Sequence, residues 1–196
     1  MVADTPISTT GDGVAANDAK TSQVRLLVVV NVLPARLDWL EALAQGDDIF
    51  SARFGIPVVT DWVGFPEALP TAIEEARRRP EDPWGTHLFF DDDGALVGFG
   101  GFKGEPGDGE VELGYAVAPV RQGRGIATAV VEELLGRART AGVKVVSAHT
   151  LAEENASTAV LRKTGFTRTG ELREPDGDVW RWERALTGSA EHGEPR

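Results

Sequence analysis

The chain contains no cysteine, which excludes disulfide bonds, catalysis by a thiolate and metal sites with cysteine ligands. Its three histidines, His87, His149 and His192, lie far apart and lack the spacing of metal ligands, so no metal is expected. Long apolar runs are also missing. The longest, Leu26 to Val30, is far too short to span a bilayer, and no membrane partner is expected.

Basic residues are scarce. Lys and Arg number 20 against 31 Asp and Glu, which gives a formal net charge of -11. This balance argues against nucleic acid and against anionic membrane surfaces as partners, because both require a basic face. It suits a positively charged small molecule or peptide, although acidic residues also serve solubility alone.

The length of 196 residues suits one domain, and 41% apolar residues suffice for a packed core. Residues 1–23 are polar and non-periodic, without the basic start and apolar stretch of a signal peptide. We expect disordered tails at 1–23 and 187–196, one domain over 24–186, and a cytoplasmic location.

Apolar periodicity predicts a single mixed α/β domain. Helices are expected after Pro34 and at 69–79, 126–141 and 157–164, with an aromatic-containing loop before the second helix. Because the helix 126–141 is a crossover connection, the fourth and fifth strands should be parallel. The expected strands are 24–32, 87–91, 96–103, 110–117, 143–150, 166–172 and 179–186.

A glycine-rich segment precedes the clearest amphipathic helix. Successive backbone N–H groups at such a helix start can converge on an anion, although a lone Gly-x-Gly is more often an ordinary turn. A P-loop would need Gly-Lys followed by Ser or Thr, and the chain has no such sequence. A dinucleotide fingerprint would need a small residue at Thr128 and an acid where His149 stands, so both known phosphate loops fit poorly.

The pattern Gln122-x-x-Gly125-x-Ala127 resembles the acyl-CoA pyrophosphate motif of the GNAT superfamily of N-acetyltransferases. The preceding Val111-Glu112-Leu113-Gly114-Tyr115 and the following His149-Thr150-Leu151 resemble the neighbouring strands of that family. The resemblance covers about Leu96 to Leu186 and is nearest to the branch of the ribosomal-protein N-terminal acetyltransferases.

The resemblance implies a mostly antiparallel sheet whose parallel fourth and fifth strands splay apart around acetyl-CoA. Backbone groups near Ala116 and Val117 would bind pantetheine, freed from the sheet by a bulge. Asn155 and Ser157 would contact pantetheine from the other wall, the alternative being a helix cap. The pyrophosphate would lie on the loop and first helical turn formed by Gln122, Gly123, Arg124, Gly125, Ile126, Ala127 and Thr128.

One position departs from the family pattern. The family asparagine lies three residues before the serine, where this chain has Glu154, and Asn155 lies two before Ser157. Either the turn is adjusted so that Asn155 reaches the pantetheine, or another group makes that contact.

Acetylation of an amine requires loss of a proton from an ammonium whose pKa is about 10. A carboxylate can accept it, directly or through water. Glu112 is the candidate base, with Glu110 on the same face of the strand as the alternative. The ordinary reading of either is a solvent-facing strand residue. The N–H of Val117 would stabilise the oxyanion.

The proton donor to the leaving thiolate stays open. In many family members it is a tyrosine at the position that Leu161 occupies here. Tyr115, the only tyrosine in the chain, is a catalytic candidate, although packing beside the site is its default role. Ser157 is another possible donor, and His149 is expected to be a structural histidine.

The predicted function is direct transfer of acetyl from acetyl-CoA to an amine-bearing small molecule or a peptide N-terminus. The alternatives are a non-catalytic acyl-CoA sensor and a transferase of longer acyl groups. Acids at 91–93, Glu110 and Glu112 are expected near the acceptor entrance. The oligomeric state, monomer or homodimer, stays open. The aromatic residues expected around the acceptor pocket are Trp39, Phe54, Trp62 and Phe65.

Overall fold

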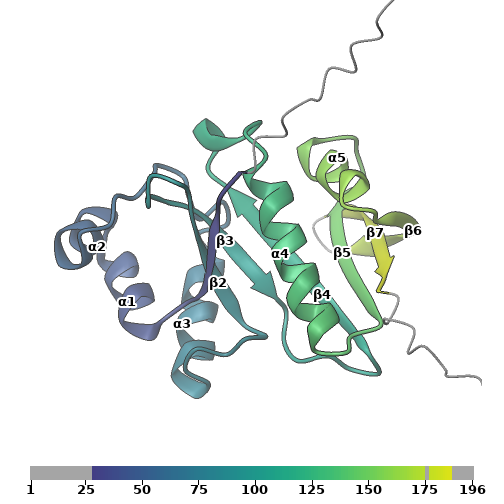
Figure 1. Cartoon of the computed structure of the whole chain (residues 1–196), viewed down its shortest axis with the longest axis horizontal. Helices are drawn as coiled ribbons and strands as arrows, with labels where there is room; N and C mark the ends of the chain where they lie inside the picture. The colour runs from purple at the N-terminus through teal and green to yellow at the C-terminus, as the bar shows by residue number, and fades with distance from the viewer. Residues whose placement is uncertain (1–27, 175–176, 187–196) are drawn as a thin grey trace, which may run out of the picture.

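A seven-stranded sheet forms the centre of the computed structural model, which describes residues 28–174 and 177–186 (Figure 1). The strand order is β1-β2-β3-β4-β5-β7-β6, and only β4 and β5 run parallel. The expected mixed, mostly antiparallel sheet with a parallel fourth and fifth strand is confirmed. The strands are β1 (Asn31–Pro34), β2 (Thr86–Phe90), β3 (Leu96–Phe102), β4 (Glu110–Val117), β5 (Val145–Leu151), β6 (Thr167–Glu174) and β7 (Gly177–Ala185).

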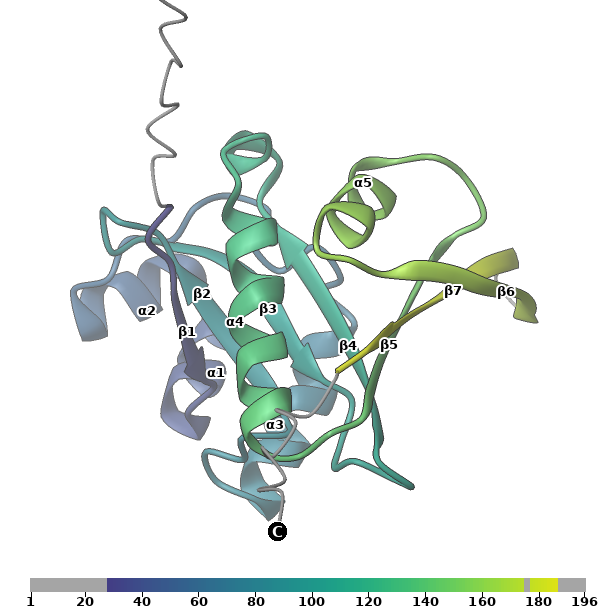
Figure 2. The same ribbon diagram turned by 45° about the vertical axis from the view of Figure 1, so that its right-hand side comes forward.

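Helices cover the two faces of the sheet unequally. Figure 2 shows α4 in front of the sheet, α5 beside it, and the first three helices behind. The helices are α1 (Leu37–Gln45), α2 (Asp47–Phe54), α3 (Ala68–Arg78), α4 (Ile126–Thr140) and α5 (Ala156–Lys163), with a short 3₁₀ turn η1 (Pro119–Arg121) before α4.

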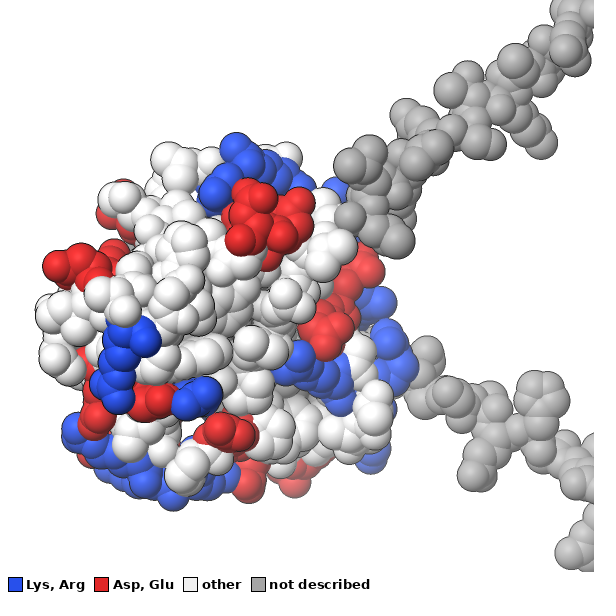
Figure 3. All heavy atoms as spheres, turned by 60° about the vertical axis from the view of Figure 1, so that its left-hand side comes forward, with Lys and Arg blue, Asp and Glu red and all other residues white. Residues whose placement is uncertain are grey.

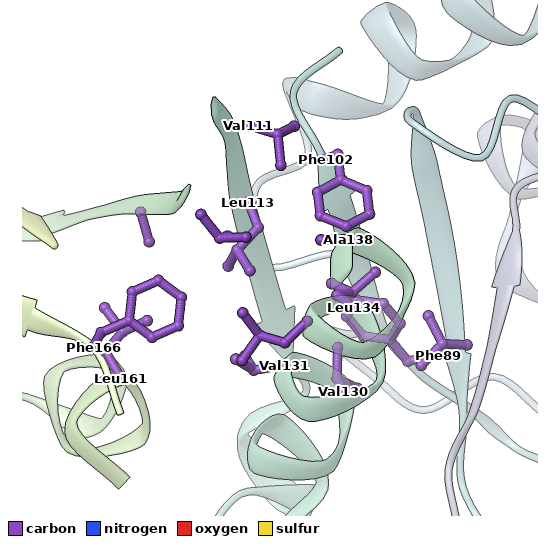
Figure 4. Close-up of a cluster of buried hydrophobic side chains, with 14 of the residues drawn as sticks. Phe89, Phe102, Val111, Leu113, Val130, Val131, Leu134, Ala138, Leu161 and Phe166 are labelled. Carbon is purple, nitrogen blue, oxygen red and sulfur yellow. The ribbon is translucent and has the colours of Figure 1, made fainter. Parts of the chain in front are cut away.

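Alternation along the strands creates two hydrophobic cores. On one face Val111 and Leu113 of β4 pack against Val131 and Leu134 of α4 (Figure 4). On the other face Leu88 of β2 and residues of β3 pack against the first three helices. Because both faces of β2 and β3 are buried, these strands are apolar or glycine except for Thr86 and His87 at the start of β2.

Glycines let β3 pack closely against β4. A Cβ atom on Gly100 would lie 2.3 Å from the carbonyl oxygen of Gly114. A Cβ atom on Gly98 would lie 2.5 Å from the carbonyl oxygen of Ala116. Any larger residue at these positions must push β4 outward, so the glycines fix the position of the strand that forms one wall of the site described below.

The prediction for the first strand is wrong in its bounds. Of the range 24–32, residues 24–27 lie outside the described residues, residues 28–30 are not strand, and β1 begins at Asn31. Pro34 ends this strand instead of opening a helix, and α1 begins at Leu37. The described part of β1 pairs only with β2, and an edge strand tolerates the missing N–H of proline.

Helix α2 was predicted to be a loop. Phe50 is its only buried residue, so the segment lacks the apolar stripe by which helices are recognised in a sequence. Signals at its ends were available: Asp47 and Asp48 in the first turn, Arg53 in the last, and Gly55 after it.

The predicted tails at 1–23 and 187–196 lie outside the described residues, as do residues 175 and 176 between the last two strands. Among the described helices, none has the length and apolar character needed to cross a membrane.

Candidate active site

The parallel strands β4 and β5 separate shortly after they begin. They pair at Glu110 with Val145, Val111 with Val146 and Glu112 with Ser147, and the pairing ends there. Beyond this point β4 pairs with β3 and β5 pairs with β7. The remainder of β4 therefore has one edge without a neighbouring strand.

The ladder between β3 and β4 shows which backbone groups face this free edge. Lys103 N donates to Glu112 O at 2.9 Å, and Ala118 N donates to Val97 O at 2.8 Å. Antiparallel pairs alternate in their hydrogen bonding. The N–H and C=O groups of Tyr115 and Val117 therefore point away from β3, toward the gap. The predicted bulge is not present, since the register between β3 and β4 is continuous, and the splay itself frees these groups.

A cleft of about 670 Å³ opens along this free edge. Its walls come from the end of β4, the loop before α4, the first turn of α4, one face of α5 over its whole length, and the loop at 61–65. The residues predicted from the sequence that line it are Tyr115, Ala116, Val117, Gln122, Gly123, Gly125, Ile126, Ala127, Thr128 and Ser157. Arg124, Asn155 and Glu112 do not line it.

The glycine loop leaves the start of α4 open to an anion. Gly123 and Gly125 have φ angles of 74° and 86°, a left-handed conformation that glycine adopts without strain. Within the described residues no side chain caps the helix at Gly125, and its first turn holds no acid. Gln122 Nε2 donates to Val117 O at 3.0 Å, which ties the loop to the end of β4. Free N–H groups and the helix dipole together suit a phosphate group.

Tyr115 links the two walls of the cleft. Its hydroxyl group donates to the Ser157 carbonyl oxygen at 3.3 Å, across the gap between β4 and α5. Burial raises the pKa of the Tyr115 phenol well above its usual value, so the hydroxyl group keeps its proton at neutral pH. Leu161, which stands where many family members have a tyrosine, is buried in the core.

Glu112 lies at the point where the strands separate, on the face opposite Leu113. Its carboxylate accepts a hydrogen bond from Lys103 and another from His149 Nδ1, the latter at 3.0 Å. Burial alone would raise the pKa of Glu112, but these hydrogen bonds outweigh burial and the pKa lies below its usual value. The alternative base, Glu110, pairs with Arg181.

Asn155 caps α5. Its side chain accepts from Thr158 N at 3.1 Å, and Thr158 Oγ1 accepts from Asn155 N at 3.1 Å. The carboxylate of Glu154 pairs with Arg162, and this hydrogen bond holds the pKa of Glu154 at about 2. The cap accounts for Asn155 without a ligand, so its contact with pantetheine stays a prediction.

The loop before α3 holds two residues that the sequence did not single out, Asp61 and Gly64, beside the expected aromatics Trp62 and Phe65. Trp62 is buried, donates from Nε1 to Asp47 Oδ1 at 3.0 Å and packs edge-on against Phe99. Gly64 lies so close to β4 that a Cβ atom would stand 2.4 Å from the Cβ of Ala116. This anchoring places Asp61 and Phe65 in the cleft wall.

The four aromatic residues expected around the acceptor therefore divide. Phe65 is 58% exposed and lines the cleft, whereas Trp62 is core, and Trp39 and Phe54 pack against the second core.

The acids expected near the acceptor entrance are largely neutralised. Asp91 is only 4% exposed and pairs with Arg121, while Glu110 and Glu112 pair with basic residues. On the face drawn in Figure 3, acidic and basic side chains lie next to each other. The net charge of -11 therefore does not translate into a uniformly negative surface on that face.

Residues 39–167 match the family model of an acetyltransferase (GNAT) domain. No curated protein sequence matches the chain. The ribosomal-protein-S18-alanine N-acetyltransferase from Escherichia coli has a similar structure, with a TM-score of 0.59 and 18% identity, covering 86% of this chain and 100% of that one.

Two further solved structures are similar. The ribosomal-protein-alanine N-acetyltransferase from Brucella melitensis has a TM-score of 0.57 and 24% identity, covering 81% of this chain and 99% of that one. The phosphinothricin acetyltransferase from Sinorhizobium meliloti, solved with acetyl-CoA, has a TM-score of 0.59 and 19% identity, covering 84% of this chain and 91% of that one. At identities below 25%, the similarity to these structures shows a shared fold and nothing about substrates.

Proposed function

The chain belongs to the GNAT acetyltransferase family, and from this membership we propose that it transfers the acetyl group of acetyl-CoA directly to a primary amine. The acceptor is a small molecule or a protein N-terminus. The observation that carries the proposal is the cleft along the free edge of β4, which ends at the uncapped start of α4. Because acetyl-CoA is the co-substrate, the proposed location of the protein is the cytoplasm.

The cleft fits the parts of acetyl-CoA in order. The backbone N–H groups of residues 123–127 would hold the pyrophosphate, because they meet no competing side-chain cap. The N–H of Gln122 already donates to Pro119 O at 3.2 Å. The free backbone groups of Tyr115 would pair with the amides of the pantetheine arm, with Ser157 on the opposite wall. The Val117 carbonyl oxygen already accepts from Gln122, and the Val117 N–H is left for the thioester. When bound, acetyl-CoA supplies a thioester that an uncharged amine can attack.

Glu112 would take the proton of the acceptor amine. Its depressed pKa keeps it ionised at neutral pH, and the hydrogen bonds from Lys103 and His149 fix its position. Because Glu112 is outside the cleft wall, the proton would reach it through water. Glu110 is the alternative and lies on the same face of β4, but it is already paired with Arg181.

Two groups would stabilise the charge that moves to the thioester. The Val117 N–H, free of β3, would donate to the developing oxyanion. The Tyr115 hydroxyl group, which keeps its proton, would turn from the Ser157 carbonyl oxygen and donate a hydrogen bond to the departing thiolate. Tyr115 then takes the role for which Leu161 has no suitable group.

A thiol-release assay with a panel of amines tests the proposal. The panel contains a peptide with a free N-terminus, the same peptide with an acetylated N-terminus, a polyamine, an aminoglycoside and an amino acid. We expect release of coenzyme A that depends on one of the free amines, with matching acetylated product by mass spectrometry. Tight binding of acetyl-CoA without release for any amine would favour the acyl-CoA sensor instead.

A further inference from the structure

The charged side chains that line the cleft are mostly cationic, in contrast to the protein as a whole. Of the described residues that line it, Arg121 and Lys163 are the only two that are basic, and Asp61 is the only acid. The protein carries a net charge of -11. A cleft with this local excess of positive charge suits an anionic ligand segment, and Arg121 stands next to the glycine loop.

Arg121 is held from behind by a buried carboxylate. Its Nε lies 3.3 Å from Asp91 Oδ2, and the Asp91 side chain is only 5% exposed. Asp91 Oδ1 also accepts from Ala95 N at 3.0 Å, and Gly94 N donates to Asp91 O at 2.9 Å. The turn between β2 and β3 therefore fixes the carboxylate, and the carboxylate fixes the guanidinium group.

This arrangement leaves donors of Arg121 for a ligand. Within the described part of the chain, Asp91 is the only acidic residue in ion-pair distance of Arg121. The closest approach is from Nε, which makes no hydrogen bond in the described part of the chain, and no hydrogen bond of the two terminal nitrogens is found among the described residues. A guanidinium group binds a phosphate through two parallel N–H donors, which is the geometry that these terminal nitrogens offer.

We propose that Arg121, positioned by Asp91, binds a phosphate group of coenzyme A in addition to the backbone groups of the glycine loop. The inference rests on the proposed function, since it takes acetyl-CoA as the ligand of the cleft. It assigns the buried Asp91 a positioning role at the cofactor, in place of the role near the acceptor that the sequence suggested.

Calorimetry with three ligands tests the proposal: acetyl-CoA, its 3′-dephospho form, and acetyl-pantetheine, which lacks all phosphate. We expect Arg121→Gln to weaken acetyl-CoA binding at least tenfold, about 1.4 kcal/mol. Binding of acetyl-pantetheine should not change. An equal loss with the dephospho form assigns Arg121 to the pyrophosphate, and a loss confined to acetyl-CoA assigns it to the 3′-phosphate.

Three further variants separate binding from folding and from general charge. Arg139→Gln removes the same charge from an exposed position on α4 and should leave all three affinities unchanged. Arg121→Lys keeps the charge but loses the paired donors, so it should recover only part of the affinity. Asp91→Asn should reduce the preference for phosphate-containing ligands about threefold, because it releases the guanidinium group, with a smaller cost to acetyl-pantetheine.

Equal affinity of Arg121→Gln and wild type for acetyl-CoA overturns the proposal while the proposed function stands. A lowered melting temperature with unchanged ligand preference also overturns it, because the ion pair would then only join two loops. If the wild-type protein itself binds no acetyl-CoA, both the proposed function and this inference fail.

Discussion

The two halves of the sheet, which meet at the splay between β4 and β5, are buried to different degrees. They share the core under α4, to which β2 contributes Phe89 and β7 contributes Trp182. The second core, under the first three helices, contains no described residue of β4, β5, β6 or β7. Strands β2 and β3 are therefore covered on both faces, whereas β5 and β7 are covered on one.

The other face of β5 and β7 carries charged and polar groups. His149 on β5 lies opposite Arg181 on β7, and Glu112 of β4 joins the same surface through its hydrogen bond to His149. The covered half holds its shape by close packing, and the half-covered side holds polar groups by ion pairs. Glu112, the proposed proton acceptor, lies on the half-covered side, where it can pass a proton to solvent.

A larger side chain should destabilise the protein most in the half of the sheet that is covered on both faces. We expect Gly100→Val to cost about 4 kcal/mol of unfolding free energy or to abolish folding, because its side chain would meet the backbone of β4. Urea unfolding measures this cost. Gly136→Ala is the control, since a Cβ atom there meets nothing within 4 Å and the site is helical. The control should be neutral or stabilising by roughly 1 kcal/mol, and similar costs for both variants would refute the difference.

The covered half also contains a buried histidine, His87, whose pKa differs between the folded and the unfolded protein. His87 is fully buried on β2, its Nδ1 lies 2.9 Å from Gly85 O, and burial lowers its pKa to about 4. In the unfolded chain His87 becomes protonated as the pH falls below ~6.5, whereas in the folded protein it stays neutral down to about pH 4. The unfolding free energy should therefore fall by about 3 kcal/mol over this window as pH decreases.

His87→Gln removes that titration. The substitution also shifts the unfolding free energy of the variant, relative to wild type, by an amount that does not depend on pH. The quantity to compare is therefore the slope of the unfolding free energy against pH. Urea unfolding between pH 7 and pH 4.5 should give a shallower slope for the variant than for wild type. Parallel slopes would show that His87 does not account for the pH dependence.

Glu112→Gln tests the chemistry assigned to the half-covered side. The substitution keeps the shape and removes the proton acceptor, so kcat should fall about 10²-fold, with acetyl-CoA affinity nearly unchanged. The acidic limb of the pH–rate profile should also disappear. Glu110→Gln, on the same face, is the matched variant and should keep most of the activity. A reversed ranking would make Glu110 the base.

Tyr115→Phe has the smallest expected effect, because a thiolate leaves tolerably well without a proton. We expect kcat to fall about tenfold while acetyl-CoA affinity and melting temperature change little. Steady-state kinetics and calorimetry separate these quantities. A drop in melting temperature without a change in kcat would return Tyr115 to a packing role.

The sequence predicted the parts of the site that have local signatures. The glycine loop at 122–127 and the apolar stripe of α4 are both visible within a few residues of chain, and the structure has them where they were expected. The missed helix α2 has the reverse property, because its single buried residue, Phe50, contacts a core assembled from distant segments. A pattern that depends on distant partners has no periodicity of its own to detect.

The acids expected near the acceptor entrance were wrongly placed for the same reason, because their partners lie far away in the chain. Asp91 reads as a solvent-facing turn residue next to two other aspartates, and only its partner Arg121, thirty positions later in the chain, makes it a buried ion pair. Trp62 reads as one aromatic among several, yet its contact with Phe99 fixes the loop that lines the cleft.

By itself the sequence determined the order of strands and helices from 86 onward, the parallel pair around α4 and the glycine loop before α4, because each follows from periodicity or from glycine at a helix start. The tertiary structure decided which polar groups meet. The pairing of Glu112 with His149, of Tyr115 with Ser157 and of Asp91 with Arg121 joins residues far apart in the chain. Such contacts depend on where the strands separate and on how the loops pack, and no local pattern encodes those distances.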